Sequence, residues 1–179
     1  MEYQPDTVKL IVNALAFNAC WFGLVLLGNV AVPFALMWVA LHITLQQEPW
    51  QELRYIAAVL AIGVVSDSLL VTTGVLTFET STLWLPGWMI ALWLSFSTTL
   101  NHSLSVLRRS RLLRAGVALT GAPSSYLLGS RLGGVELGFS LPVTFAIFSV
   151  TWFILLEVFS WIPLQRPSPI NTTQNHKQR

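Results

Sequence analysis

The segment AIGVVSDSLLVTTG at residues 61–74 places one acidic residue in the middle of an apolar run. The run extends far enough on either side to cross the roughly 30 Å hydrocarbon core of a bilayer as a helix, at about 1.5 Å per residue. Asp67 follows Arg54 by thirteen residues, which puts it about 20 Å along that helix, near the middle of the bilayer. A charge at that depth costs roughly 2.5 to 3.5 kcal/mol on insertion scales, so such residues face other helices. The segment therefore predicts a transmembrane helix with a bundle around it.

The rest of the chain has the composition of a membrane protein. Of its 179 residues, 54% are hydrophobic and 10% are charged, against about 25% charged in soluble domains. Apolar runs of about 20 residues recur along nearly the whole length and leave little sequence for a soluble domain. Cys20 is the single cysteine, which excludes an intrachain disulfide and a cysteine-based zinc or iron–sulfur site.

Six apolar segments predict an all-α fold, a polytopic transmembrane bundle that occupies residues 1–164 as one domain. The predicted spans are 8–27, 31–47, 54–76, 84–105, 112–132 and 141–163. In the turn between the first two, Asn29 is predicted to cap the second helix, because asparagine accepts hydrogen bonds from the first N–H groups of a helix. Residues 165–179 are rich in Pro, Asn, Thr and Gln and predict a disordered cytoplasmic tail.

The distribution of positive charge predicts the orientation, because lysine and arginine are retained on the cytoplasmic side in short loops. Six spans put both termini on one side, and placing that side in the cytoplasm leaves only Arg131 outside. The inside set is Lys9, Arg54, Arg108, Arg109, Arg111, Arg114, Arg166, Lys177 and Arg179. The cluster RRSRLLR at 108–114 is then a topological signal beside anionic headgroups, and we predict no nucleic-acid binding.

Polar residues from five spans gather in the predicted cytoplasmic half of the bundle. We predict that they surround a polar cavity formed by Asp67, His102, Asn101, Glu157, His42 and Asn18. In the fourth span, four polar residues recur at i, i+3, i+7 and i+10, so one face of a continuous helix would carry them into the bundle. They are Ser95, Thr98, His102 and Ser105.

The histidines and acids raise the question of a metal site. Imidazole and carboxylate suit zinc or iron, but the chain has no local spacing such as H-E-x-x-H. We therefore predict no metal and no cofactor. A serine hydrolase is not favoured either, because the chain lacks a nucleophile elbow of the G-x-S-x-G type.

The fifth span carries a stripe of small residues and a proline. Four of its residues, spaced four apart, form a pattern that lets another helix approach closely. They are Gly121, Ser125, Gly129 and Gly133. Pro123, near the middle of the span, removes an intrahelical hydrogen bond and predicts a kink. Tight helix packing around a kink is favoured, with a broken helix lining a substrate cavity as the alternative.

Three segments of the chain resemble a family of small bacterial inner-membrane proteins catalogued as a domain of unknown function (DUF2878). They are DSLLVTTGVLTF at 67–78, LWLSFSTTLNHSL at 92–104 and GAPSSYLLGSRLGG at 121–134. The likeness extends over roughly residues 8–160. The landmarks of the family map here onto Asp67, Asn101, His102, Gly121, Pro123, Ser125 and Tyr126. The resemblance assigns no chemistry to them.

Together these features predict a multi-pass protein of the bacterial inner membrane with both termini cytoplasmic. The leading hypothesis is transport or handling of a small or lipid-like molecule through the polar cavity, with the lipid bilayer as surroundings and partner. One alternative is an intramembrane enzyme acting on lipid, with His102 as acid/base and Asp67 as its orienting group or a metal ligand. The other is a structural or assembly subunit that docks a membrane protein partner on the fifth span. Transport requires Asp67 to line an open cavity, and catalysis requires Asp67 or Glu157 within a few ångström of His102 or His42.

Overall fold

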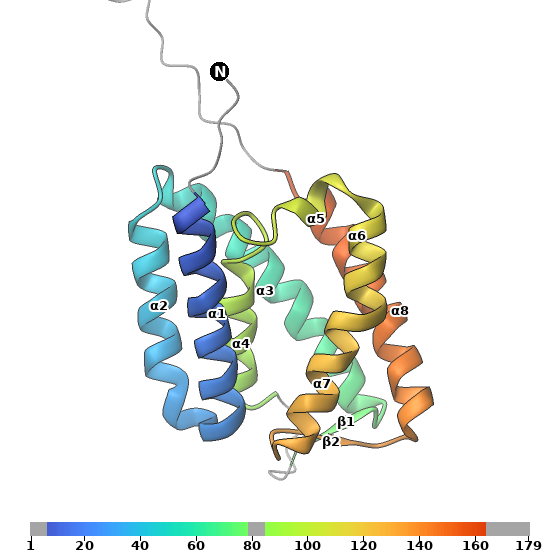
Figure 1. Cartoon of the computed structure of the whole chain (residues 1–179). Helices are drawn as coiled ribbons and strands as arrows, with labels where there is room; N and C mark the ends of the chain where they lie inside the picture. Colours follow the sequence, from blue (N-terminus) through green and yellow to red (C-terminus); the bar gives the residue numbers. More distant parts are fainter. Residues whose placement is uncertain (1–6, 79–84, 164–179) are drawn as a thin grey trace, which may run out of the picture.

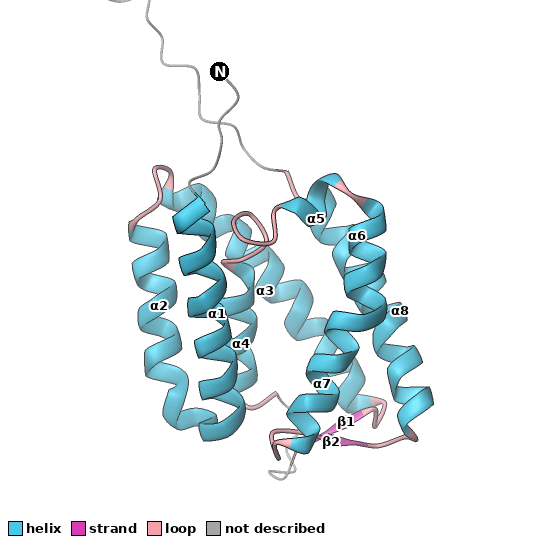
Figure 2. Ribbon diagram, in the orientation of Figure 1, coloured by secondary structure: helices cyan, strands magenta, loops and turns pink. Residues whose placement is uncertain are grey.

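The computed structural model describes residues 7–78 and 85–163, and within them the chain is almost entirely helical (Figure 2). The predicted all-α class is confirmed, and the predicted tail at 165–179 lies outside the described residues. The elements are α1 (Thr7–Leu27), a 3₁₀ turn (Gly28–Ala31), α2 (Val32–Thr44), α3 (Pro49–Thr72), β1 (Leu76–Thr77), α4 (Gly87–Ser97), α5 (Val106–Arg109), α6 (Arg111–Gly116), a π-helical segment (Val117–Gly121), α7 (Ala122–Arg131), β2 (Glu136–Leu137) and α8 (Leu141–Trp161).

The helices form a bundle in which α1, α2 and α4 stand on one side and α6, α7 and α8 on the other (Figure 1). Helix α4 packs against α1, α2 and α3, while α7 and the π-helical segment pack against α8. The start of α1 and the end of α8 lie at the same end of the bundle (Figure 1). At the opposite end, β1 pairs antiparallel with β2, with Leu76 opposite Leu137 and Thr77 opposite Glu136.

Three stretches of the described chain are long and apolar enough to cross a membrane: Thr7–Thr44, which contains α1 and α2, then Pro49–Thr72 and Leu141–Trp161. Large apolar side chains also cover the outside of the bundle, including Phe34 and Met37 on α2, which are 67% and 66% exposed. An apolar outer surface of this kind suits a lipid environment, because monomeric soluble proteins rarely expose large contiguous apolar patches. The structure therefore supports a membrane protein.

Helix bounds follow the predicted spans except in α3 and α4. Helix α3 begins at Pro49, five residues before the predicted start at residue 54. Proline is favoured in the first helical turn because its missing N–H has no intrahelical partner there. The extension brings Glu52, which lies between the second and third predicted spans, into the first turn of α3.

Helix α4 is shorter than the predicted span 84–105 because asparagine side chains from α1 and the 3₁₀ turn bound both of its ends. The Asn29 side chain accepts a hydrogen bond from the Trp88 backbone N–H at 2.9 Å. Asn29 therefore caps α4. The predicted cap on α2 is wrong, since the N-terminus of α2 has no side-chain cap. At the other end, the Asn13 amide donates to the Thr98 carbonyl at 3.1 Å and its oxygen accepts from the Ser103 hydroxyl at 2.6 Å.

Hydrogen bonds from side chains to the backbone also destabilise the C-terminal end of α4. Four serine and threonine hydroxyls donate to carbonyl groups three or four residues back, a contact that competes with regular helix geometry. They belong to Ser95, Ser97, Thr98 and Thr99. The chain then forms turns up to residue 105, so the single helical face predicted for Ser95, Thr98, His102 and Ser105 does not exist. His102 is instead oriented by a turn.

The predicted fifth span is one helical run from α6 to α7 with a π-helical segment at Val117–Gly121. There the Ala122 N–H donates to the Val117 carbonyl, five residues back. Pro123 follows directly and has no N–H of its own, so the regular ladder cannot continue through it. The run thus departs from α-helical geometry at Val117–Gly121, just before the proline, in the form of a π-bulge.

Candidate functional site

The carboxyl group of Asp67 is buried at the junction of α3, α4 and α7. Asp67 is only 1% exposed. Its Oδ2 accepts a hydrogen bond from the Trp93 indole N–H at 2.8 Å, and its Oδ1 accepts one from the Tyr126 hydroxyl at 2.9 Å. A buried carboxyl needs such partners, because leaving one unpaired costs several kcal/mol. Asp67 therefore joins two aromatic rings from two other helices to α3.

Both rings are fixed by close packing as well. Gly63, one turn before Asp67, leaves room for the Trp93 ring, since a Cβ atom on residue 63 would lie 2.3 Å from two ring carbons. Trp93 stacks on Trp152 of α8, with ring centroids 5.5 Å apart and planes at 11°. Tyr126 stacks on Phe148 of α8 at 4.3 Å. The aromatic contacts connect α4, α7 and α8 around the Asp67 carboxyl.

A cavity of about 380 Å³ lies between α1 and α4 on one side and the α6–α7 run and α8 on the other, the two groups separated in Figure 1. Its lining is predominantly apolar, with prominent contributions from Phe17, Trp21, Phe96, Trp93, Tyr126 and Trp152. The two Asp67-bound rings are thus part of its wall, while Asp67 itself lies behind them. Asp67 therefore does not line the cavity, contrary to what the transport hypothesis required. Phe22 and Leu128 also line the cavity and are 46% and 42% exposed, so its mouth is on the apolar outer surface.

The small residues of the fifth span border this cavity. Gly121, Ser125 and Gly129 all belong to its lining. A Cβ atom on Gly121 would meet only the Val117 side chain within 4 Å, and one on Gly129 only Val135. Gly133 lies beyond α7 in a turn with φ of +83°. Cβ positions at Gly121 and Gly129 therefore meet no other helix among the described residues, and these small residues give room to the cavity.

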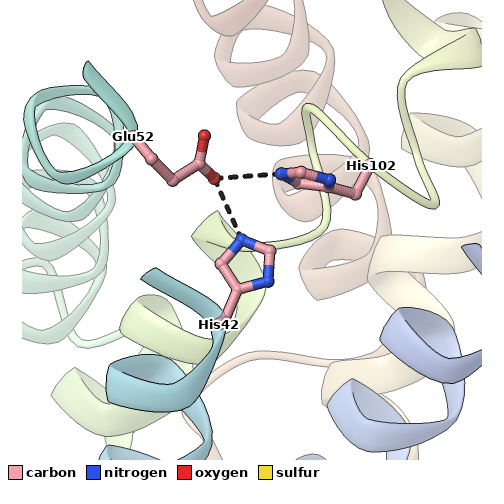
Figure 3. Close-up of side chains that lie close together, drawn as sticks. All are labelled: His42, Glu52 and His102. Carbon is pink, nitrogen blue, oxygen red and sulfur yellow. Dashed lines mark hydrogen bonds and ion pairs between the residues drawn. The ribbon is translucent and has the colours of Figure 1, made fainter. Parts of the chain in front are cut away.

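A second polar cluster lies near the end of the bundle that holds the start of α1 and the end of α8. His42 in the last turn of α2 and His102 in the turn after α4 both direct Nε2 at the same oxygen, Glu52 Oε1, at 3.1 and 3.2 Å (Figure 3). The two imidazole rings meet edge to face, with centroids 4.6 Å apart. The side chains of His42 and Glu52 are 5% and 10% exposed, and that of His102 is 26% exposed. His42 and Glu52 are therefore buried, and the cluster is accessible along His102.

Glu52 is absent from the predicted site residues because it falls between the predicted spans 31–47 and 54–76. A signal was nevertheless present, since proline at residue 49 indicates a helix start and puts Glu52 in register with the later buried positions of α3. Buried residues recur every three or four positions along that face: Glu52, Ile56, Val59, Gly63, Asp67 and Leu70. One face of α3 thus carries both buried acids.

The six residues predicted to form one polar cavity divide among separate sets of contacts. Only His42 and His102 come together. Glu157 pairs with Arg114 at 2.9 Å and with Arg111 at 3.5 Å. Asn18 lines the apolar cavity, and its amide donates to the Ala14 carbonyl of its own helix.

Asn101 belongs to a set of contacts around Arg108. The Arg108 guanidinium donates to Asn101 Oδ1 at 3.4 Å and to the Tyr55 hydroxyl at 3.2 Å. It also donates to the carbonyl groups of Phe159, Ser160 and Ile162 at the end of α8. Arginine at a helix C-terminus satisfies carbonyl groups that lack intrahelical partners. Arg108, from the basic cluster at 108–114, therefore also caps the C-terminus of α8.

The carboxylate beside the two histidines is Glu52. The hydrogen bonds of Asp67 go to Trp93 and Tyr126, and the ion pairs of Glu157 go to two arginines. The pairing of His102 with Asp67 that the enzyme hypothesis invoked is therefore not present among the described residues.

Comparison with known families finds a match over most of the chain. The family model described as protein of unknown function (DUF2878) matches residues 10–158. The chain belongs to this family. No curated protein and no solved structure matches the sequence or the fold. The match covers α1 through most of α8, including Asp67, Trp93, Tyr126 and the three residues of the histidine–glutamate cluster.

Proposed function

We propose that this membrane protein binds a lipid-like molecule in the cavity between α1, α4 and α7. The observation that carries the proposal is the apolar cavity of about 380 Å³ whose mouth lies at exposed Phe22 and Leu128. Ligand sites are commonly concave, mostly apolar and about 300 to 1,000 Å³ in volume. A mouth in the lipid-facing surface gives an acyl chain direct entry, whereas a polar solute would have to cross apolar surroundings.

The rigid wall supports the same proposal. Asp67 holds Trp93 and Tyr126 by hydrogen bonds, and Trp152 and Phe148 of α8 stack on them. A wall held from several helices keeps the cavity open without a ligand, which lowers the cost of ordering on binding. Asp67 acts as a positioning residue in this proposal, since its own carboxyl stands behind the rings.

The experiment is photocrosslinking in nanodiscs that contain a phospholipid with a diazirine near the middle of its acyl chain. Peptide mapping should find crosslinks concentrated on the cavity-facing side of α1 and α7, above the level on the outer face of α2. The variant Gly121→Phe fills the cavity border, where a Cβ atom makes only an ordinary contact with Val117 at 3.6 Å. It should lower cavity labelling several-fold.

The matched control is Gly116→Phe, five residues earlier on the same run. A Cβ atom there meets nothing within 4 Å, and Gly116 does not line the cavity. Cavity labelling at the background level of α2, or equal labelling in the two variants, would reject the proposal.

We further propose that the bundle crosses the membrane six times, with the start of α1 and the end of α8 in the cytoplasm. Six described positive charges belong to α1, α3, α5 and α6 near that end of the bundle, and Arg131 is the last residue of α7, which ends at the other (Figure 1). This asymmetry supports the cytoplasmic assignment.

Cysteine labelling in a Cys20→Ser background tests the crossing number. Both test positions are exposed, Glu48 between α2 and α3 and Ser140 before α8. An impermeant maleimide should modify Ser140→Cys in intact cells and Glu48→Cys only after the membrane is opened. Labelling of both in intact cells, or the reverse pattern, would contradict the topology.

A further inference from the structure

The cluster of His42, Glu52 and His102 brings together the donor set of a transition-metal site. Two imidazoles and one carboxylate suit divalent zinc and its neighbours, and three protein ligands with one open position are typical of accessible zinc sites. Their donor atoms all lie within 4.8 Å of one another. The residues come from α2, α3 and the turn after α4, so only the tertiary structure assembles them.

Two of the three distances between donor atoms are close to what an ion requires, and the third is no more than 4.8 Å. With zinc–ligand bonds of about 2.0 to 2.1 Å, neighbouring donors of a tetrahedral site are about 3.3 to 3.4 Å apart. The two Nε2 atoms lie 3.1 and 3.2 Å from Glu52 Oε1. An ion would therefore replace the hydrogen bonds between the two Nε2 atoms and Oε1, with shifts of a few tenths of an ångström along these two edges.

The surroundings leave a path for the ion. His102 is the most exposed member, at 26%, and it belongs to a turn at the end of the bundle, not to the middle of a helix. His42 and Glu52 are almost fully covered. Solvent thus reaches the cluster along His102, and that side is where a fourth ligand, a water molecule, would complete the coordination.

The geometry points to a site for one divalent transition-metal ion, of which zinc is the representative, held by His42, Glu52 and His102. A bound ion would tie α2 and α3 to the chain after α4. Because an ion that binds only the folded protein adds stability by mass action, loading should also raise resistance to unfolding. The site is separate from the proposed lipid cavity, whose lining includes none of the three residues.

The test uses the full chain in detergent, carrying a tag without histidine and stripped with a chelator. Titration with Zn²⁺ against a competing chromophoric chelator should give one ion per chain. His42→Ala and Glu52→Gln should each weaken binding at least about 100-fold, since removing even an outer-shell partner of a metal ligand commonly costs 10- to 100-fold. Glutamine at 52 keeps an amide oxygen beside the histidines, so its loss of affinity reports the carboxylate and not the fold.

Two matched controls separate this site from adventitious binding. His176→Ala removes the third histidine of the chain, and Glu136→Gln removes an acid in β2 at the opposite end of the bundle. Both should bind zinc as the parent does. Less than one ion per chain in the parent protein, or an equal loss in His176→Ala and His42→Ala, overturns the proposal.

An independent measurement on the parent protein does not depend on any variant folding. X-ray absorption of the zinc-loaded chain should show two imidazole ligands with the remaining donors oxygen. A spectrum with no imidazole contribution overturns the proposal.

Discussion

Replacing Gly63 by alanine should displace Trp93 and loosen the wall of the cavity. The added Cβ would lie 2.3 Å from ring atoms Cδ2 and Cε3, where carbon atoms in contact are normally about 3.5 to 4.0 Å apart. The ring must therefore move by more than about 1 Å. Trp93 is only 3% exposed, so it cannot swing freely into solvent or lipid.

The size of the effect follows from two losses. Overpacking a tight core costs about 1 to 3 kcal/mol. A ring shift of that size also lengthens the 2.8 Å hydrogen bond to Asp67 beyond bonding distance, and interhelical hydrogen bonds in membrane proteins contribute about 0.6 to 1.7 kcal/mol. Alanine returns about 0.5 to 1 kcal/mol through its better helix propensity. We expect a net loss of about 1 to 4 kcal/mol in the free energy of unfolding.

The assay is unfolding by sodium dodecyl sulfate in mixed micelles, followed by far-ultraviolet circular dichroism. Near-ultraviolet circular dichroism should change as well, because Trp93 and Trp152 stack at 11°. Gly116→Ala is the control, since its Cβ meets nothing within 4 Å, and it should be neutral or stabilising. In a Trp93→Leu background the alanine at 63 should cost much less. Unchanged stability and an unchanged near-ultraviolet spectrum in Gly63→Ala would refute the packing argument.

Two further substitutions test hydrogen bonds near the cavity wall, one made by Tyr126 and one made by Asn29. Tyr126→Phe should lower the free energy of unfolding by about 1 kcal/mol, because it removes the hydroxyl that donates to Asp67. The variant keeps the ring stacked on Phe148. A loss of cavity labelling with no change in stability would contradict the role of the Tyr126 hydroxyl as a stabilising donor to Asp67. Asn29→Ala should also cost about 1 kcal/mol, because it removes the side-chain acceptor of the Trp88 N–H at the start of α4. Equal stability in detergent unfolding would show that this cap contributes nothing.

Much of the helix pattern could be predicted from local sequence. An apolar run of about 20 residues in lipid has few alternatives to a helix, because every backbone polar group must be satisfied within the segment. Helices α1 and α8 therefore begin and end within about two residues of the predicted bounds, a scatter that assignment alone produces. The end of α4 could not be predicted in this way, because the Asn13 side chain that holds it comes from 85 residues away in the sequence.

The candidate sites depended on tertiary contacts even more strongly. The depth of Asp67 along its helix could be calculated, but its partners depend on how α3, α4 and α7 are rotated about their axes, and periodicity within one helix does not contain that information. Trp93 and Tyr126 carried no polar signal that singled them out as its partners. The small residues of α7 illustrate the same point, since a stripe that permits close helix packing equally permits a cavity.

The sequence by itself determined that this chain is an all-α protein with a lipid-compatible surface, and that a carboxyl at residue 67 had to face protein. Those conclusions rest on hydration energies and helix geometry, which act residue by residue. Only the tertiary structure decided that Asp67 supports an aromatic cavity wall and that Glu52, not Asp67, stands between the two histidines. Each of these outcomes depends on side chains from different helices meeting within hydrogen-bond distance, and helix rotation and close packing fix that distance.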